Sequence, residues 1–305
     1  MRLIIVIPAT NEDSSIGDVL SHIPQSLPGI SDIRTIVVDD GSTDSTVSAA
    51  HSFGATVISH PERLGLASAF RTGLKAALRR KADFIATIDA DGQYRPEELT
   101  ILLQEMQRTH ADMVVGNRCI LSCDHMPAGN RIGNLIGSLM LRMMGVTKIC
   151  DASSGFRLFN ARLGESLRIM SRHTYTHEML IQADAYGFNV VDTPVSFRPR
   201  AHGKSKLVRT LRHHILRSCG TIIRATFLYR PLRKFLLLSA ACMVLGGLIT
   251  IYALRDFTFH FSSMMLAILF AVAGIQFLIL GVIAESYAAD RRLMHEHDTA
   301  FLEHA

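Results

Sequence analysis

The chain has 305 residues, 32 Lys/Arg, 27 Asp/Glu and a mean hydropathy of +0.23. This length suits one domain of about 200 residues with an appendage, and the hydropathy is high for a purely soluble protein. The five cysteines form no C-x-x-C pair and no zinc-binding spacing, which excludes a zinc module and indicates reduced thiols in a cytosolic domain.

Basic residues gather in one segment. Residues 198–234 contain eleven Lys/Arg and no Asp/Glu, whereas the rest of the chain has 21 basic and 27 acidic residues. Such a belt suits anionic lipid headgroups or phosphate. A nucleic-acid patch is the alternative. We expect no nucleic-acid partner, because the belt leads directly into apolar segments.

The first 200 residues alternate β-branched runs with helix-like segments. Strands are predicted at 3–8, 35–39, 55–59, 84–89 and 112–116, with helices at 65–80 and 96–107. The first apolar run is short and is followed by Pro8 and Asn11-Glu12, so we interpret it as a buried strand and not as a secretory signal. The alternation predicts an α/β domain with a Rossmann-like, mostly parallel sheet.

Acidic residues follow two of the predicted strands. Asp39-Asp40 and Asp89-Ala90-Asp91 both lie at carboxyl ends, where open α/β sheets bind their ligands. With Gln93, the second cluster offers the hard oxygen ligands that Mg²⁺ takes together with substrate phosphates. The alternative is that Asp89 or Asp91 only caps the helix that begins near Pro96.

The C-terminal third predicts membrane attachment. Residues 207–233 predict a basic amphipathic helix in the membrane interface, with an ordinary surface helix as the alternative. The apolar stretches 235–254 and 264–284 are uncharged, and each is long enough to span a hydrocarbon core of about 30 Å. Their short connector predicts a hairpin, although two buried core helices remain an alternative.

The flanking charges predict the orientation. Lys/Arg residues precede the first span and follow the second, which places both termini in the cytoplasm by the positive-inside rule. We therefore expect an integral membrane protein with its first domain on the cytoplasmic face. The predicted regions are 1–206 for that domain, 207–233 for the interfacial helix, 234–285 for the hairpin and 286–305 for a cytoplasmic tail. Small residues in the spans allow a homo-oligomer; these are Gly246, Gly247, Gly274 and Gly281.

Three motifs at strand ends carry a resemblance to a known family. They are Pro8-Ala9-Thr10-Asn11-Glu12, Val37-Val38-Asp39-Asp40-Gly41-Ser42-Thr43-Asp44 and Asp89-Ala90-Asp91-Gly92-Gln93. In this order and spacing they resemble the family 2 glycosyltransferases, which have the GT-A fold. Further motifs resemble the polyprenyl-phosphate hexosyltransferase branch, which includes dolichol-phosphate mannose synthase. These are Gly116-Asn117-Arg118, Asp151-x-x-Ser154-Gly155-Phe156-Arg157, Glu178 and Arg200-x-x-Gly203-x-Ser205-Lys206.

The resemblance, which covers residues 1–206, implies roles for individual residues. It implies donor binding by Pro8, Thr10, Glu12, Val37, Asp39, Asp89, Ala90, Asp91, Gln93 and Arg118. It implies Mg²⁺ or Mn²⁺ held by Asp91, Gln93 and Asp89. It implies contact with the acceptor phosphate by Arg118, Arg131, Ser154, Arg200, Ser205 and Lys206. The expected catalytic set is Asp89, Asp91, Gln93, Arg118, Arg200 and Lys206.

The resemblance predicts transfer of one hexosyl group from a nucleotide-diphosphate sugar to a polyprenyl phosphate with inversion. The acceptor phosphate is largely dianionic at neutral pH, so we expect no general base. GDP-mannose and UDP-glucose are the leading donors. Thr10 stands where an aromatic residue is frequent, and His177 lies near the place of a donor-binding Lys in some members, so the donor stays open.

Other functions remain to be distinguished. The chain has no Trp, which excludes the Q-x-x-R-W motif of processive polysaccharide synthases. No G-x-G-x-x-G follows the first strand, which disfavours a dinucleotide-binding enzyme. A catalytically idle membrane scaffold that binds nucleotide-sugar, and a glycosyltransferase of the same fold with another acceptor, remain as alternatives.

Overall fold

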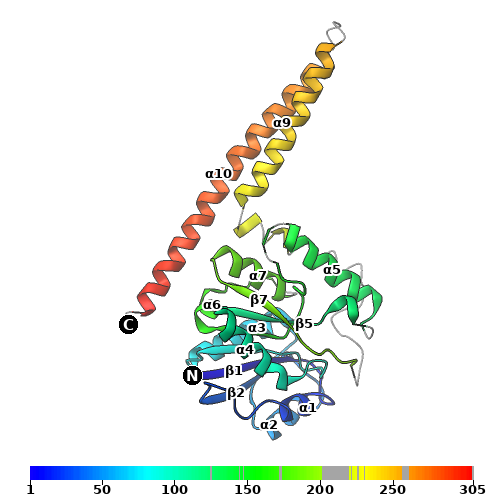
Figure 1. Ribbon diagram of the computed structural model, residues 1–305. Coiled ribbons are helices and arrows are strands. Elements are labelled where there is room, and N and C mark those ends of the chain that lie inside the picture. The colour runs from blue at the N-terminus through cyan, green and yellow to red at the C-terminus, as the bar shows by residue number, and fades with distance from the viewer. Residues whose placement is uncertain are drawn as a thin grey trace. The chain divides into compact units, whose positions relative to one another are not determined.

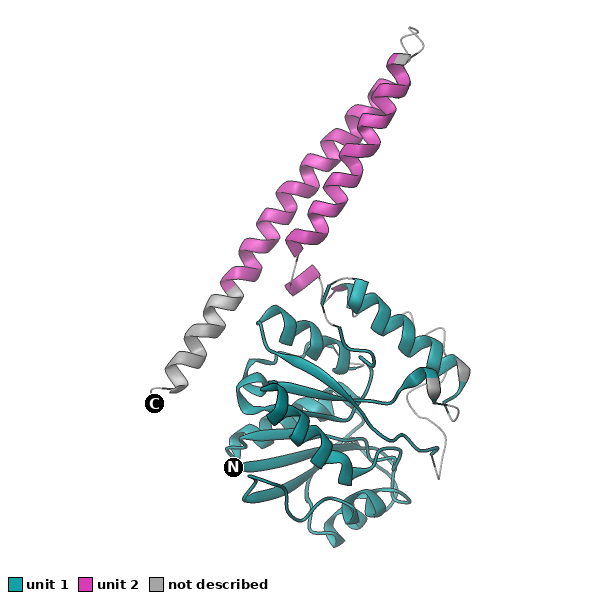
Figure 2. Cartoon of the chain, viewed as in Figure 1, with its two compact units in different colours: residues 1–223 teal, residues 224–305 magenta. Residues whose placement is uncertain are grey.

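The computed structural model describes residues 1–123, 126–143, 145–146, 148–171, 174–200, 220, 222–224, 227–229, 231–255 and 261–303. The chain divides into two compact units, Met1–Ile223 and Arg224–Ala305 (Figure 2). Most of the predicted interfacial helix, 207–233, lies outside the described residues. The division into four regions therefore stays a prediction.

Unit 1 is built on a seven-stranded sheet (Figure 1). Its strands are β1 (Arg2–Ala9), β2 (Asp32–Asp39), β3 (Thr56–Ser59), β4 (Phe84–Thr87), β5 (Met113–Asn117), β6 (Arg157–Asn160) and β7 (Val190–Pro194), in the order β3-β2-β1-β4-β6-β5-β7. All pairs are parallel except those of β6, which runs antiparallel to β4 and to β5. The predicted α/β fold with a mostly parallel sheet is confirmed.

Helices cover both faces of this sheet (Figure 1). They are α1 (Ile16–Ser21), α2 (Thr46–Ser52), α3 (Leu66–Arg79), α4 (Leu99–Thr109), α5 (Ala128–Met143), α6 (Ala161–Ser166) and α7 (Thr176–Ala185), with short 3₁₀ turns η1 (Pro96–Glu98) and η2 (Ile120–Ser122). Alternate residues of a strand point to opposite faces. Leu3 and Ile5 of β1 therefore pack in one core cluster with Leu102 of α4, while Val6 faces α3.

Unit 2 is a hairpin of two long helices, α9 (Pro231–Arg255) and α10 (Phe261–Glu303). The segments 231–254 and 261–290 are long enough to cross a membrane, and 18-residue stretches within them have mean hydropathies of 2.2 and 2.7. The two predicted spans are thus confirmed as apolar helices of sufficient length. Their large apolar side chains are mostly exposed, as lipid-facing residues are.

Glycines bring the two helices of the hairpin together. A Cβ at Gly246 would lie 3.1 Å from the Ala267 carbonyl oxygen, and one at Gly274 would lie 3.2 Å from that of Ser239. Small residues allow such close backbone approach between membrane helices. These glycines are therefore used in packing α9 on α10, while Gly247 has no neighbour within 4 Å. The predicted homo-oligomer is not tested by this arrangement.

The contact between α3 and β1 gives a test of the core. A Cβ on Gly73 would overlap Cγ1 of Val6. We expect Gly73→Ala to lower the free energy of unfolding by about 1–3 kcal/mol, because overpacking outweighs the roughly 1 kcal/mol gain in helix propensity. Val6→Ala in the same chain should restore part of the loss. Thermal unfolding in detergent measures both, and an unchanged Gly73→Ala protein would contradict the packing.

Candidate active site

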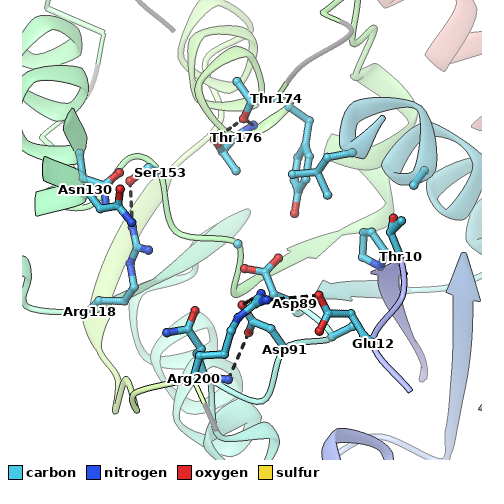
Figure 3. Close-up of a pocket in the computed structure, with 18 of the residues that line it drawn as sticks. Thr10, Glu12, Asp89, Asp91, Arg118, Asn130, Ser153, Thr174, Thr176 and Arg200 are labelled. Carbon is cyan, nitrogen blue, oxygen red and sulfur yellow. Dashed lines mark hydrogen bonds and ion pairs between the residues drawn. The ribbon is translucent and has the colours of Figure 1, made fainter. Parts of the chain in front are cut away.

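A cavity of about 270 Å³ opens at the carboxyl ends of β1, β2 and β4. Residues that follow these strands line one side, and residues of α5 and of the start of α7 line the other (Figure 3). The predicted residues that line it are Pro8, Thr10, Glu12, Asp89, Ala90, Asp91, Gln93, Arg118 and Arg200. Segments from distant parts of the sequence thus bring carboxylates and three arginines, Arg63, Arg118 and Arg200, into one cavity.

Four predicted residues lie outside the cavity lining. Val37 is fully buried in β2, and Asp39 is buried with Oδ1 accepting the Ser42 N–H at 3.0 Å. Arg131 donates from Nη2 to the Cys123 carbonyl at 2.6 Å, and the Ser154 hydroxyl lies 3.1 Å from that of Tyr94. The side chains of Asp39, Arg131 and Ser154 thus stabilise turns or loops beside the cavity, whereas Val37 packs in the core. Ser205 and Lys206 lie outside the described residues.

Several lining residues were not predicted as site residues. They are Asp40, Arg63, Asn130, Ser153, Thr174, Tyr175, Thr176, His177 and Phe197, among others. Asp40 is buried, and its carboxylate accepts the N–H groups of Leu64 and Gly65 at 2.8 Å each. Asp40, the neighbour of Asp39 just beyond the end of β2, was within reach of the sequence pattern. Of the α7 residues in the lining, His177 had a signal only in the resemblance, near the place of a donor-binding Lys, and Thr176 had none.

Asp89 carries an unfavourable charge at the floor of the cavity. Gly155 approaches it so closely that a Cβ there would lie 2.6 Å from either carboxylate oxygen. Burial, and then the neighbouring charge of Asp91, raises the pKa of Asp89 to about 7, although Arg118, Arg200 and Arg157 oppose the shift. A cation in the cavity would stabilise the ionised carboxylate.

Arg157 is a fully buried cation that joins two walls of the cavity. Its guanidinium donates to the carbonyls of Ser154 at 2.9 Å, Ala152 at 2.8 Å and Thr176 at 2.8 Å. Burial lowers its pKa to about 10. These bonds attach the 152–155 loop to the first residue of α7, and both segments supply lining residues. Arg157 therefore fixes the shape of the cavity from beneath.

Arg118 reaches the cavity as half of a buried ion pair. Its Nε and Nη2 donate to the two carboxylate oxygens of Asp151 at 2.6 and 2.8 Å, and Nη2 also donates to the Ser153 hydroxyl at 2.8 Å. Burial opposes the charge on Asp151, but Arg118 holds the pKa of that carboxyl below its usual range. The bidentate geometry fixes the guanidinium plane. Arg118 is thus a positioned positive charge.

Glu178 lies in the first turn of α7 and does not line the cavity. It is buried, and its two carboxylate oxygens accept the N–H groups of Met170 and Ser171 at 2.9 Å each. Arg71 donates to the carbonyl of Ser171 at 3.0 Å and so holds the same segment. Glu178 therefore orders the segment that leads into α7, and its geometry does not suit a general base.

The carboxylates of the cavity fit a divalent cation that arrives with a diphosphate. Asp91 and Glu12 converge on one cation, the Arg200 guanidinium, at 2.7 and 3.5 Å. Among the described residues no three His, Cys, Asp or Glu side chains form a metal cluster. Mg²⁺ typically uses one or two carboxylates and completes its coordination with substrate phosphates and water. The donor set therefore suits a shared site, not a closed one.

The raised pKa of Asp89 predicts a pH-dependent stability. The pKa of an aspartate in an unfolded chain is near 3.9, so the folded protein binds this proton more tightly and loses stability as the pH rises from about 4 to 7. We expect metal-free Asp89→Asn to be more stable than the wild type at pH 8. Its gain in the free energy of unfolding, measured by thermal unfolding, should be roughly 2 kcal/mol smaller at pH 5.

Two further measurements control this experiment. Glu62→Gln changes an exposed carboxylate and should show no pH-dependent gain. Added Mn²⁺ should stabilise the wild type more than Asp89→Asn, because only the wild type keeps the carboxylate. A difference between wild type and Asp89→Asn that stays constant from pH 5 to pH 8 would contradict the raised pKa.

The geometry of Glu178 predicts the behaviour of Glu178→Gln. The amide keeps one acceptor for two N–H groups, so we expect a loss of about 1–3 kcal/mol in stability and a fall in kcat of less than tenfold, with the pH profile unchanged in shape. Removal of a general base would cost roughly 10²–10⁴ in rate and one limb of the profile. The exposed Glu165→Gln is the matched control.

The sheet, the D-x-D turn at the end of β4 and the cavity beside it together define a glycosyltransferase of GT-A type. The chain belongs to glycosyltransferase family 2, since the protein-family model described as "Glycosyl transferase family 2" matches residues 4–166. It is 34% identical over 213 residues to an uncharacterized glycosyltransferase of Mycobacterium tuberculosis, over 70% of this chain and 92% of that relative.

Two further comparisons extend this result. The chain is 28% identical over 221 residues to the undecaprenyl-phosphate mannosyltransferase of Micrococcus luteus, over 68% of this chain and 88% of the relative. Glucosyl-3-phosphoglycerate synthase from Mycobacterium tuberculosis, crystallised with Mn²⁺, uridine diphosphate and phosphoglyceric acid, superposes with a TM-score of 0.56 at 22% identity. That match covers 74% of this chain and 77% of the other, and it shows the fold.

Proposed function

We propose that this glycosyltransferase moves one hexosyl group from a nucleotide-diphosphate sugar to a polyprenyl phosphate with inversion. One observation carries the proposal: a single cavity combines the Asp89 and Asp91 carboxylates with the arginines Arg118 and Arg200, in a chain with two helices long enough to span a membrane. The similarity to an undecaprenyl-phosphate mannosyltransferase supports a polyprenyl-phosphate acceptor. GDP-mannose and UDP-glucose are the leading donors.

In this proposal the donor lies along the strand ends. Pro8, Thr10 and Glu12 line the part of the cavity that would take the nucleoside, and Asp40, just after β2, would line the same part. Val37 and Asp39, predicted to touch the donor, would act through the shape of the β2 turn. Asp91 and Gln93, with Asp89, would hold Mg²⁺ or Mn²⁺. When bound, the ion supplies Lewis-acid stabilisation to the diphosphate leaving group.

The acceptor phosphate supplies its own nucleophilic oxygen, since it is largely dianionic at neutral pH. Arg118 would bind and orient this phosphate, and Asp151 keeps its guanidinium in place. Arg200 would share the phosphate charge, with Ser205 and Lys206 in the same segment. Glu178 accepts hydrogen bonds from the Met170 and Ser171 N–H groups, which supports a reaction without a carboxylate base. Attack in line with the leaving group inverts the anomeric carbon.

The experiment that tests this function is a donor screen. Purified full-length protein in detergent receives a polyprenyl phosphate, Mg²⁺ or Mn²⁺ and each nucleotide-sugar in turn, and mass spectrometry detects lipid-linked sugar. We expect a single hexosyl group from one donor, with loss of product when a chelator is added. Nucleotide binding without product from any donor would instead support the idle-scaffold alternative.

We also propose that α5 lies on the cytoplasmic surface of the bilayer. The side chains of Ile132, Leu139 and Met143 are 53%, 51% and 78% exposed. The helix has no acidic residue and contains Arg131 and Arg142. An apolar face with basic flanks suits an interfacial helix on anionic lipid. The same helix lines the cavity through Asn130 and Asn134, so this position would put the cavity near a lipid phosphate.

Serine substitutions on this face test the membrane contact. We expect the triple variant Ile132→Ser, Leu139→Ser, Met143→Ser to lose roughly tenfold in transfer to a polyprenyl phosphate embedded in vesicles, because apolar area leaves the bilayer. Transfer to a short, water-soluble acceptor should stay unchanged. Ile101→Ser, on the exposed side of α4, is the control. Equal losses with both acceptors would indicate damage to the cavity instead.

A further inference from the structure

Arg200 contacts two carboxylates of the cavity, and the phosphate role expected for this residue does not explain these contacts. Its Nη2 lies 2.7 Å from Asp91 Oδ2, and its Nη1 lies 3.5 Å from Glu12 Oε1. The three side chains are 17%, 13% and 13% exposed. The guanidinium is therefore held in the cavity, on the Asp91 carboxylate that a divalent cation would need and close to Glu12.

The backbone before Arg200 is hydrogen-bonded to the turn that carries Asp91. The Arg198 N–H donates to the Gln93 carbonyl at 2.8 Å, and Gln93 Nε2 donates to the Arg198 carbonyl at 3.1 Å. Phe197 forms a β-bridge with Tyr94 and contacts its ring edge-on at 5.2 Å between centroids. Because the 197–198 backbone is fixed, the Arg200 side chain can leave Asp91 by a change of rotamer without movement of that backbone.

The charges in the cavity explain why a cation occupies this place. Glu12, Asp89 and Asp91 are three of the four carboxylates that line the cavity, and the fourth, Asp40, accepts two backbone N–H groups. Buried carboxylates without a counter-charge cost free energy. Arg200 provides one positive charge, bonded to Asp91 and close to Glu12. A divalent cation would provide two, but it needs the same Asp91 carboxylate.

We propose that Arg200 is the internal counter-ion of the metal site, and that Mg²⁺ or Mn²⁺ binds by displacing its guanidinium from Asp91 and Glu12. The displaced guanidinium is then available within one side-chain length for a phosphate oxygen of the substrates. Metal binding and phosphate binding are thus coupled through one residue. The inference rests on the proposed function for the identity of the phosphate, whereas the displacement itself concerns only the protein and the ion.

The test is the affinity for Mn²⁺ alone, measured on the full-length protein by electron paramagnetic resonance without nucleotide or lipid. Arg200→Met removes the competing charge, so Mn²⁺ should bind roughly tenfold more tightly than to the wild type. Arg200→Lys keeps a cation and should stay within about threefold of the wild type. Arg198→Gln removes an exposed charge two residues away and controls for the general loss of positive charge.

A second measurement must move in the opposite direction. With Mn²⁺ saturating, and with the donor found by the screen, Arg200→Met should lower kcat/KM roughly a hundredfold, because the phosphate ligand is lost. Tighter Mn²⁺ binding together with slower transfer supports the exchange. Equal Mn²⁺ affinities for wild type, Arg200→Met and Arg198→Gln overturn it even if transfer occurs.

Two remaining outcomes also decide the question. An equal gain in Mn²⁺ affinity for Arg198→Gln and Arg200→Met overturns the exchange, because general electrostatics would then explain it. No Mn²⁺ binding by any variant overturns both the exchange and the proposed metal dependence. The unfolding temperature of each variant is measured first, and Arg200→Lys carries the test if Arg200→Met unfolds: strong tightening in Arg200→Lys contradicts competition by charge.

Discussion

The shape and charge of the cavity in unit 1 depend on how buried charge is arranged where β4 pairs with β6. Asp89 follows β4, and Arg157 begins β6, so the antiparallel pairing of these strands brings an acid and a base into the same interior. The Arg157 guanidinium donates to three backbone carbonyls. The pKa of Asp89 stays raised despite the nearby arginines, so its ionised carboxylate still costs free energy. One pairing of short strands therefore places both the cation that shapes the walls and the Asp89 carboxylate beside the cavity.

Three arginines near Asp89 perform different work because their partners differ. Arg157 bonds to backbone carbonyls and sets the shape of the cavity. Arg118 is fixed on Asp151 and supplies a positioned charge. Arg200 pairs with carboxylates of the site itself, and the proposal makes this pair exchangeable. Residue type alone does not distinguish a structural cation from one that binds a ligand, since burial and partners decide it.

The sequence predicted the parts of the fold that have strong local signals. The strands β1 to β5 carry continuous β-branched runs, and the two spans are long and uncharged, so their positions could be inferred. The strand β6 has four residues and begins with an arginine, which local propensity does not favour as a buried position. It is a strand because it fills the gap between β4 and β5, a tertiary constraint with no local signal.

The part of the candidate site that follows predicted strands was predictable from the sequence, whereas the part on α5 and α7 was not. The D-x-D turn lies in the cavity because it directly follows a predicted strand. Asp40, not Asp39, faces the cavity, since successive residues of an extended segment point in opposite directions. The contributions of α5 and α7 depend on long-range packing, such as a Cβ at Gly137 lying 2.9 Å from His177 Nε2. A single sequence holds no direct record of that packing.

The position of β6 in the sheet also has a consequence for biosynthesis. A chain leaving the ribosome can pair β1, β2, β3 and β4 early, but β4 then keeps an open edge until Arg157–Asn160 has been made. Open edges are sites of wrong pairing between nascent chains. The first apolar helix begins only at Pro231. The sheet can therefore close on the ribosome before the first of the two helices that are long enough to span a membrane emerges.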